Sequence, residues 1–401
     1  MQSAELLEQG QLLRRQDRAS AIHYFEKWLN IADERTDRLA LATASMELAL
    51  ELIEISQPEG LLRANSLLQK AEDLLKNYPS NCDRQKAYLH YCQGIWALKQ
   101  NNLADGISLL QAAYQTYEQI NDLEGLALTD DALGKYYATI GDFQTALFHL
   151  ERSLSLRQEL DDEHAKAISF GHLGRIHLQI EELDPVEDLF QTSLEIGLAY
   201  EDEVLRIQAL SGLAQLAIAR SQWQLAIAMI QEALDLTQEP LDTKRVAYLS
   251  LDFAEALLGD DRLEDSLKSI DLEVMPRFVK LQDKVGIAVA KRMRGRILYR
   301  RLLDGLDTLE EDTIEIAEDT LLDASMLFEQ AKMPQEYAKT LYDLAFLYQL
   351  CLNSRFKYQY QGKSVRSLEL ALNVLEQYNQ GNTRLASQME AMLMHAMGGA
   401  L

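Results

Sequence analysis

The stretch Ala132–Leu154, "ALGKYYATIGDFQTALFHLERSL", decides the fold because it is one copy of a repeating two-helix pattern. Its first helix has one apolar face, formed by Leu133, Gly134 and Tyr137 at helical spacing. A Gly-Asp pair marks a turn, and the second helix has an apolar stripe at Ala146, Leu150 and Leu154. One such pair cannot bury its apolar faces alone, so it needs neighbours on both sides.

The pattern returns every 40 residues, which indicates a stacked array of helix pairs. Further copies begin at His172, Gly212 and Asp252. The first helix of each copy has a small residue in the same register: Gly134, Gly174, Ala214 and Ala254. Gly94 keeps the 40-residue step upstream, and Ala49, Gly295 and Ala345 continue the series with inserted residues. Small residues let neighbouring helices approach closely, so the sequence predicts an all-α solenoid with a continuous core.

The composition agrees with a helical, globular protein. Of 401 residues, 47% are hydrophobic, and only 6 are proline and 19 glycine. The 63 acidic residues outnumber the 39 basic ones, and the formal charge of −24 makes nucleic acid an unfavourable partner. Three scattered cysteines, no apolar signal segment and no apolar run of about 18 residues predict a cytoplasmic protein that does not enter the membrane.

The same residues resemble a known family. The Leu-Gly pair, the tyrosine three residues after the glycine, the Gly-Asp turn and the alanine twelve residues after the first glycine resemble the tetratricopeptide repeat. Such repeats commonly have about 34 residues, and a 40-residue step is similar to the longer-helix class of kinesin light chains and many bacterial regulators. The resemblance implies a right-handed α-solenoid whose first helices line a concave face that binds peptides or proteins.

The repeats differ in regularity along the chain. We expect one solenoid of eight to nine helix pairs over residues 1–401, with irregular repeats at 5–82 and regular repeats at 87–240. Residues 241–382 form repeats with an acidic insertion at 303–319 and an aromatic, basic insertion at 353–364. In the second insertion Phe356, Tyr358 and Tyr360 alternate, and we expect an exposed ridge.

A last helix at 383–398 follows these repeats. Its apolar stripe comprises Leu385, Met389, Met392, Leu393 and Ala396. The stripe predicts a capping helix, because terminal repeats need a cover. The alternative is a Met-rich docking surface or a homodimer interface, since methionine adapts to varied partners.

No constellation of catalytic residues is evident. The sequence lacks the HExxH, GxxxxGK(S/T), GxSxG and paired CxxC motifs. His172 and His177 lie five residues apart, a spacing that does not place two metal ligands on one helix face. We therefore expect a non-catalytic protein that needs neither a metal nor a cofactor.

One short stretch has the opposite charge to the chain as a whole. Residues 291–301, "KRMRGRILYRR", contain six basic residues. Counted from the small residue Gly295, the groove-facing places of the resembled fold form one stripe: Arg292, Arg296, Tyr299 and Arg300. Tyr342 and Phe346 occupy such places one repeat later. These six residues are the predicted partner-binding site, and arginine would suit an acidic partner because it binds carboxylates in bidentate fashion.

Two local explanations of the basic stretch compete with a docking site. In one, the acidic insertion at 303–319 folds back over the stretch. In the other, Glu255, at the matching place one repeat earlier, pairs with it. The carboxylate clamp known in the family uses lysine and asparagine, and here Arg292 and Arg296 fall at two of those places with no asparagine.

Three functional hypotheses follow from a binding fold. The chain is an adaptor or scaffold that binds a partner protein or peptide in its groove. Alternatively, it is a signal-transduction regulator that binds a transcription or response regulator, a kinase or a cyclase. The third hypothesis is an assembly factor for a larger complex. The sequence does not separate them, because a fold does not determine a function.

Overall fold

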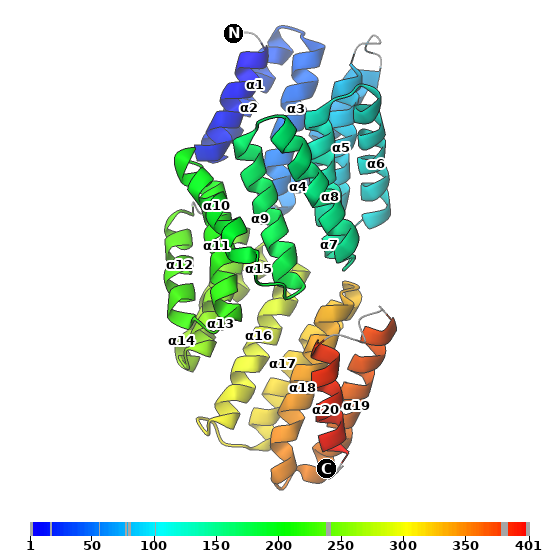
Figure 1. Ribbon diagram of the computed structural model, residues 1–401. Coiled ribbons are helices and arrows are strands. Elements are labelled where there is room, and N and C mark those ends of the chain that lie inside the picture. The colour runs from blue at the N-terminus through cyan, green and yellow to red at the C-terminus, as the bar shows by residue number, and fades with distance from the viewer. Residues whose placement is uncertain are drawn as a thin grey trace. The chain divides into compact units, whose positions relative to one another are not determined.

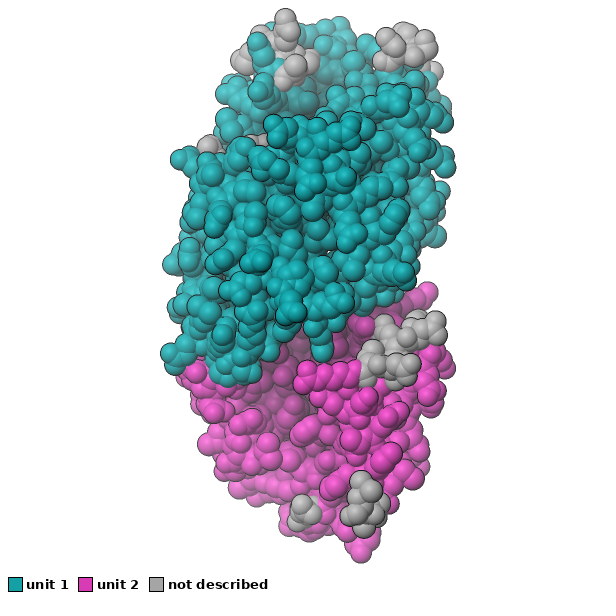
Figure 2. Space-filling model, viewed as in Figure 1, with its two compact units in different colours: residues 1–249 teal, residues 250–401 magenta. Residues whose placement is uncertain are grey.

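The computed structural model describes residues 3–16, 18–55, 57–76, 78, 82–100, 102–237, 242–377 and 384–397. Within these ranges the chain is helical and contains no strand, which confirms the predicted all-α solenoid. It divides into two compact units, Met1–Leu249 (unit 1) and Ser250–Leu401 (unit 2), which Figure 2 colours separately. We describe each unit by itself.

Consecutive helices pack in pairs, each formed by a first and a second helix (Figure 1). The early pairs are α1 (Ser3–Gln16) with α2 (Arg18–Glu34), α3 (Arg38–Ile55) with α4 (Pro58–Lys76), and α5 (Asp83–Lys99) with α6 (Leu103–Gln119). The regular pairs are α7 (Leu123–Thr139) with α8 (Phe143–Glu159), α9 (Glu163–Gln179) with α10 (Val186–Ala199), and α11 (Glu203–Ala219) with α12 (Trp223–Asp235). In unit 1 the first helix, α1, also contacts α11.

The later helices continue the series. They are α13 (Thr243–Gly259), α14 (Leu263–Lys268), the π-helical turn η1 (Ser269–Val274), α15 (Met275–Lys280), α16 (Lys284–Leu303), α17 (Glu311–Gln330), α18 (Pro334–Leu350), the 3₁₀ turn η2 (Cys351–Asn353), α19 (Lys357–Gln377) and α20 (Arg384–Ala396). The π-helical turn precedes Pro276, which lacks the backbone N–H that a regular α-helix would use there.

A close contact inside each pair explains the small residue of the first helix. A Cβ atom on Gly134 would lie 2.6 Å from Leu150 Cγ on the second helix, and one on Gly295 would lie 2.5 Å from Leu321 Cγ. Contacts this short do not occur between real side chains, so these positions exclude larger residues. The predicted role of the small residue is confirmed at both positions.

The turns that connect the helices also recur regularly, at half the length of the 40-residue repeat. Residues with positive φ follow the helices at steps of 20 from Asn121 through Gly141, Asp161, Glu181 and Glu201 to Ser221, and another lies 40 residues later at Asp261. At Gly141 the next amide, of Asp142, donates to Tyr137 O at 2.9 Å, which is the Schellman pattern. The Asp142 carboxylate then accepts from the Thr145 amide and caps the following helix. One short segment thus ends one helix and begins the next.

Buried serines link the two helices of a pair in the same register. Ser153 Oγ donates to Ala127 O at 2.8 Å, and Ser193 Oγ donates to Ala167 O at 3.0 Å, 40 residues later. Both serine side chains are buried, so each hydroxyl needs its partner inside the protein. These bonds fix the register of the two helices as well as their spacing.

The acidic insertion predicted at 303–319 is a loop only over residues 304–310. The remainder forms the first turns of α17, where Ile314, Ala317 and Leu321 are buried. Because acidic residues stand between these three apolar residues, the buried helix face is not evident from the sequence. They also suit a helix start, because carboxylates near the N-terminus are favoured by the helix dipole.

The expected aromatic ridge at Phe356, Tyr358 and Tyr360 is wrong. Tyr358 is 93% exposed, but Phe356 and Tyr360 are only 9% and 2% exposed. Because α19 begins at Lys357, residues 356 and 360 lie on the same inward face, and Tyr360 stacks on Tyr348 with ring centroids 5.5 Å apart. Phe356 and Tyr360 are four residues apart, which is the spacing of one helix face, so the alternating aromatic residues do not form an exposed ridge.

The last helix, α20, covers the final pair. Its buried residues Ala386 and Met389 belong to the apolar core of α18 and α19, and Leu385, Met392 and Leu393 pack against that core. The predicted stripe is therefore used inside the fold, as a capping helix requires. Residues 383 and 398 of the predicted element lie outside the described residues.

The positive-φ turns give a prediction about stability. Glu201, at φ 53°, is exposed and lacks the freedom of glycine in this conformation. We expect Glu201→Gly to raise the free energy of unfolding by about 0.5 kcal/mol and Gly141→Ala to lower it by about 1 kcal/mol. Urea unfolding followed by circular dichroism measures both. Equal midpoints for the wild type and the two variants would contradict the role of these turns.

Candidate functional site

The basic stretch forms part of α16 in unit 2, and carboxylates surround it. Each of its six basic side chains forms an ion pair: Lys291 with Asp323, Arg292 with Asp343 and Glu336, Arg294 with Asp271, Arg296 with Glu255, Arg300 with Asp304 and Asp261, and Arg301 with Asp307 and Glu264. The positive charge concentrated in the sequence is thus balanced locally in the structure.

Both local explanations of the stretch appear in this geometry. Glu255, one repeat earlier, accepts from Arg296 Nη1 at 3.1 Å. The start of the predicted insertion contributes Asp304, 2.8 Å from Arg300 Nε, and Asp307, 2.7 Å from Arg301 Nε. The expectation that neighbouring carboxylates pair with the helix is confirmed.

Arg292 and Arg296 are held most firmly. Arg292 Nε donates to Asp343 Oδ2 at 2.6 Å, and its Nη1 donates to Glu336 Oε2 at 3.0 Å. Desolvation lowers the pKa of Arg292, but Asp343 and Glu336 raise it above its usual value. The pKa of Arg296 is raised in the same way by Glu255 and Asp343, against desolvation. These ion pairs fix the positions of both arginine side chains on the surface of α16 and balance their charges.

The three predicted aromatic residues come together on the same surface. The rings of Tyr299 and Phe346 stack with centroids 5.9 Å apart, and those of Tyr342 and Phe346 meet edge to face at 5.8 Å. All three side chains are half-buried, so part of each ring stays accessible. We call Tyr299, Tyr342 and Phe346 the aromatic cluster. Arg300 pairs with exposed Asp261 and with Asp304 of the 304–310 loop.

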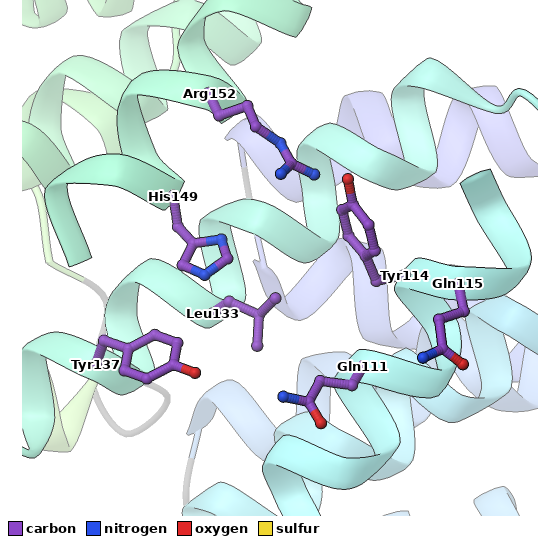
Figure 3. A pocket seen from close by; sticks show the side chains of 7 residues that line it. All are labelled: Gln111, Tyr114, Gln115, Leu133, Tyr137, His149 and Arg152. Carbon is purple, nitrogen blue, oxygen red and sulfur yellow. The ribbon is translucent and has the colours of Figure 1, made fainter. Parts of the chain in front are cut away.

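A pocket of about 370 Å³ lies in unit 1 between α6, α7 and α8 (Figure 3). Its lining residues are Gln111, Tyr114, Gln115, Leu133, Tyr137, His149 and Arg152. The Tyr137 and His149 rings stack at 5.4 Å, and the Arg152 guanidinium lies 4.6 Å from the Tyr114 ring centroid. The walls therefore combine aromatic faces with amide and guanidinium groups.

A buried carboxylate holds two of these pocket residues. Asp130 is fully buried; its Oδ1 is 2.9 Å from His149 Nδ1, and its Oδ2 accepts from Arg152 Nε at 2.8 Å. Desolvation raises the pKa of Asp130, and the hydrogen bond with His149 opposes this effect. The burial of Asp130 was not predicted. The pattern that could have indicated it is an aspartate among mostly apolar residues of a first helix.

The neighbouring Asp131 is also buried and pairs with three cationic or polar groups. His172 Nδ1 lies 2.7 Å from its Oδ1, Lys135 Nζ lies 3.2 Å from its Oδ2, and Arg157 Nη1 lies 3.7 Å from its Oδ1. Desolvation raises the pKa of Asp131, but His172, Lys135 and Arg157 hold it well below its usual value. Burial lowers the pKa of His172 even though Asp131 opposes this shift, and the His172 ring is hydrogen-bonded to the Asp131 carboxylate.

A second group that the sequence analysis missed surrounds Glu54 on α3. Lys99 Nζ lies 3.9 Å from Glu54 Oε1, and the other charges that act on Glu54 come from helices far apart in the chain. We call this group the inner cluster: Glu54, Arg18, Lys99, Lys135, Lys244 and Arg245. Lys99 lies five residues after Gly94 and Lys135 one after Gly134, which are groove-facing places. The register of the small residues therefore indicates that Lys99 and Lys135 occupy groove-facing places.

Two kinds of site do not occur among the described residues. They contain no group of three or more His, Cys, Asp or Glu side chains placed to hold a metal ion. No helix within the described ranges combines the length and the apolar character needed to cross a membrane.

No protein-family model matches the chain. Outer dynein arm-docking complex subunit 4 of Xenopus laevis is 22% identical over 211 residues, which are 52% of this chain and 39% of that relative. The chain thus spans about two fifths of the length of the curated relative it matches.

Solved structures resemble the chain over most of its length. A Rap protein complexed with Competence and Sporulation Factor has a TM-score of 0.60 at 14% identity and covers 89% of this chain and 98% of its own. The Rap conjugation gene regulator of plasmid pLS20, with a Phr peptide, scores 0.57 at 12% identity over 92% and 96%. The apo quorum sensor NprR of B. thuringiensis scores 0.51 at 14% over 88% and 97%. These likenesses show the fold, a tetratricopeptide-type solenoid.

The Asp131 network gives a prediction about pH. The folded protein holds the pKa of the Asp131 carboxyl group below its ordinary value of 3.8. Asp131 therefore contributes its full stabilisation above pH 3.8, and this contribution is lost as the pH falls further. We expect Asp131→Asn to lower the free energy of unfolding by about 1–3 kcal/mol at neutral pH. The difference from the wild type should shrink as the pH falls below about 4.

Urea unfolding at a series of pH values measures this effect. Glu195→Gln is the matched control, because Glu195 is an exposed carboxylate on α10. A difference between wild type and Asp131→Asn that stays constant with pH would contradict the proposed ion pairing.

Proposed function

We propose that this chain, a tetratricopeptide-type α-solenoid, is a non-catalytic adaptor that binds a partner protein or peptide on the groove-facing surface of its repeats. The proposed contact surface in unit 2 comprises the six predicted residues Arg292, Arg296, Tyr299, Arg300, Tyr342 and Phe346. A cytoplasmic location belongs to this proposal, as does a partner other than nucleic acid.

The aromatic cluster is the observation that supports this surface. Large rings that remain partly accessible are typical of the residues that dominate binding energy at protein interfaces. The ion pairs of Arg292 and Arg296 lie on the same helix and hold its side chains in fixed positions. A surface ordered before binding loses less conformational entropy when a partner arrives.

The charge balance changes the expected chemistry of this partner. Arg292, Arg296 and Lys339 lie among the three carboxylates of Glu255, Glu336 and Asp343. The cations and carboxylates are equal in number, so the surface has no excess charge to attract an acidic segment. We therefore propose that apolar contacts with the aromatic cluster provide most of the affinity here.

A regulator of signal transduction is the second candidate function. It is favoured by the names of the structures with a similar fold, which include a protein complexed with Competence and Sporulation Factor and a quorum sensor. In that role the chain would bind a small peptide on the same surface and change the activity of a second, regulatory protein. An assembly factor for a larger complex is the third candidate, and the name of the dynein arm-docking subunit agrees with such a role. Dimerisation through α20 is a separate proposal, since Met394 is exposed there.

The aromatic cluster gives a binding prediction. We expect the double variant Tyr299→Leu/Phe346→Leu to keep its helical structure, because both replacements are apolar. It should bind its partner about 30-fold more weakly, a loss of about 2 kcal/mol, because the stacked rings are gone. The test is capture of partners from a lysate of the native cells, identified by mass spectrometry, followed by titration of the purified partner.

The control is Tyr358→Leu, which removes an exposed ring on α19 that is not part of the aromatic cluster. It should capture the same partner as the wild type. Equal capture by the wild type and by both variants would exclude the aromatic cluster as the contact surface. A partner lost with Tyr358→Leu alone would place the contact elsewhere on unit 2.

A further inference from the structure

The pocket of unit 1 is lined by the second helices α6 and α8 and by two residues of the first helix α7, Leu133 and Tyr137 (Figure 3). These two residues stand one before and three after Gly134. The groove-facing places of the same helix are three residues before the glycine and one, four and five after it. The pocket therefore uses another face of the repeats than the proposed contact surface, and it belongs to the other unit.

A buried carboxylate and two rings hold the arginine of this pocket in place. Arg152 Nε donates to Asp130 Oδ2 at 2.8 Å, and Asp130 is fully buried. The guanidinium carbon lies 4.6 Å from the centroid of the Tyr114 ring and 5.9 Å from that of the Phe148 ring. The two terminal nitrogens of Arg152 have no hydrogen-bond acceptor within the described part of the chain. A ligand that accepts from this fixed pair of donors orders few side chains on binding.

Further polar atoms of the pocket are available to a ligand. Gln111 and Gln115 are exposed and lie four residues apart, so both side chains stand on one face of α6. Neither their amides nor the hydroxyl groups of Tyr114 and Tyr137 form a hydrogen bond with another described residue. A glutamine amide has both donors and an acceptor, as a peptide group does, so it can pair with the main chain of a bound polypeptide.

The charged residues of the pocket are not a requirement of the repeat. The places of Asp130, His149 and Arg152 are occupied by other residues in the neighbouring repeats: His90, Leu109 and Ala112 at 40 residues earlier, and Phe170, Leu189 and Thr192 at 40 residues later. Burying a charged pair is costly, and the neighbouring helix pairs form without one. A ligand therefore explains this group better than packing does.

The apolar walls indicate which side chain suits the pocket. Leu133 is buried, and the rings of Tyr137 and His149 stack with centroids 5.4 Å apart. The ring of Phe148, which is 56% exposed, meets that of His149 edge to face at 5.4 Å. Rings gain additional stabilisation from contact with other rings. The volume of about 370 Å³ lies at the lower end of the range for ligand pockets, which suits one large side chain.

The charge of the pocket argues against an acidic ligand. The Asp130 carboxylate pairs with Arg152 through one oxygen and with His149 Nδ1 through the other, at 2.8 and 2.9 Å. The positive charge of Arg152 is thus balanced inside the protein. Its terminal nitrogens serve as hydrogen-bond donors, for which an uncharged carbonyl oxygen is a sufficient partner.

We propose that the pocket binds an aromatic side chain of a partner polypeptide, with uncharged peptide groups on either side of the ring. The ring packs against Leu133 and Tyr137, a main-chain carbonyl accepts from Arg152, and the glutamine amides pair with further peptide groups. This inference rests on the proposed function, because it takes the chain to be a protein-binding module. It adds a second contact in unit 1 and states the chemistry of that contact.

The test uses N-acetyl-L-tryptophan amide, which has an aromatic side chain between two uncharged peptide groups. Saturation-transfer NMR with the full chain measures its binding, and we expect a dissociation constant of about 1 mM for so small a ligand. N-acetyl-L-alanine amide, which lacks the ring, should bind at least about tenfold more weakly. N-acetyl-L-tryptophan, which has a free carboxylate, should bind no more tightly than the tryptophan amide.

Two variants locate the bound probe. Gln111→Ala/Gln115→Ala removes both amides at exposed positions, and Arg152→Lys keeps a cation beside Asp130 but removes the pair of terminal nitrogens. Each should weaken binding of the tryptophan amide at least about fivefold. The matched control, Gln144→Ala/Gln158→Ala, changes two exposed glutamines of α8 that do not line the pocket, and it should bind the probe as the wild type does.

Circular dichroism should show that all variants keep their helical content. Equal affinity of the wild type and both pocket variants for the tryptophan amide would overturn the proposal. Equal affinities of the wild type for the alanine and tryptophan amides would overturn it as well. Tighter binding of the free acid than of the amide would show that the pocket takes an anion, which contradicts the proposed chemistry.

The outcomes for the two units can be told apart. Tyr299→Leu/Phe346→Leu should bind the probe as the wild type does, and loss of probe binding in this variant would overturn the proposal for unit 1. Failure of the probe to bind the wild type would overturn the pocket proposal alone. Probe binding that depends on Arg152, together with equal partner capture by the wild type and Tyr299→Leu/Phe346→Leu, would overturn only the proposed surface in unit 2.

Discussion

The close approach of two helices at a glycine is the constraint on which the repeats depend. Gly134 leaves room for Leu150, and Gly295 leaves room for Leu321, because neither first helix has a side chain at that point. This contact fixes the distance between the helices, and the buried serine bonds fix their register. Both features determine which first-helix positions face away from the second helix, so a packing requirement in the core decides which residues are presented to a partner.

The basic residues of the two units are distributed differently along the sequence. On α16 each cation has a carboxylate of its own, so a concentration of charge in the sequence becomes a neutral, ordered surface. In unit 1 the basic residues around Glu54 are scattered through the sequence and pair with carboxylates of their own: Lys99 with Glu54, Lys135 with Asp131, Arg18 with Glu51 and Arg245 with Asp242. The density of charge along the chain is therefore a poor guide to the charge that a ligand meets. What matters is how many cations each carboxylate must serve in space.

Much of the fold could be predicted from the sequence, because core packing repeats every 40 residues and leaves a small residue, glycine or alanine, at the same place in each regular copy. The pairing of Glu255 with α16 followed from the same register. The burial of Tyr360 could not be predicted, since it depends on where α19 begins. The inner cluster could not be predicted, because its members come from helices between α2 and α13, and no local pattern brings such distant positions together. Local spacing identifies helices and faces, whereas contacts across many repeats need coordinates.

The regular turns have a consequence for how such a chain can change in length. Positive-φ residues recur at Gly141, Asp161, Glu181 and Glu201 with the same 20-residue step. After Gly141, Asp161 and Glu201 the next residue is an aspartate that caps the following helix, whereas after Glu181 the next helix begins at Val186. A block of 40 residues between two such turns therefore starts and ends in the same backbone conformation. Duplicating or deleting one whole block would join equivalent ends without a new loop. The length of the array can thus change in units of one repeat during evolution or in design, while the join itself remains native in geometry.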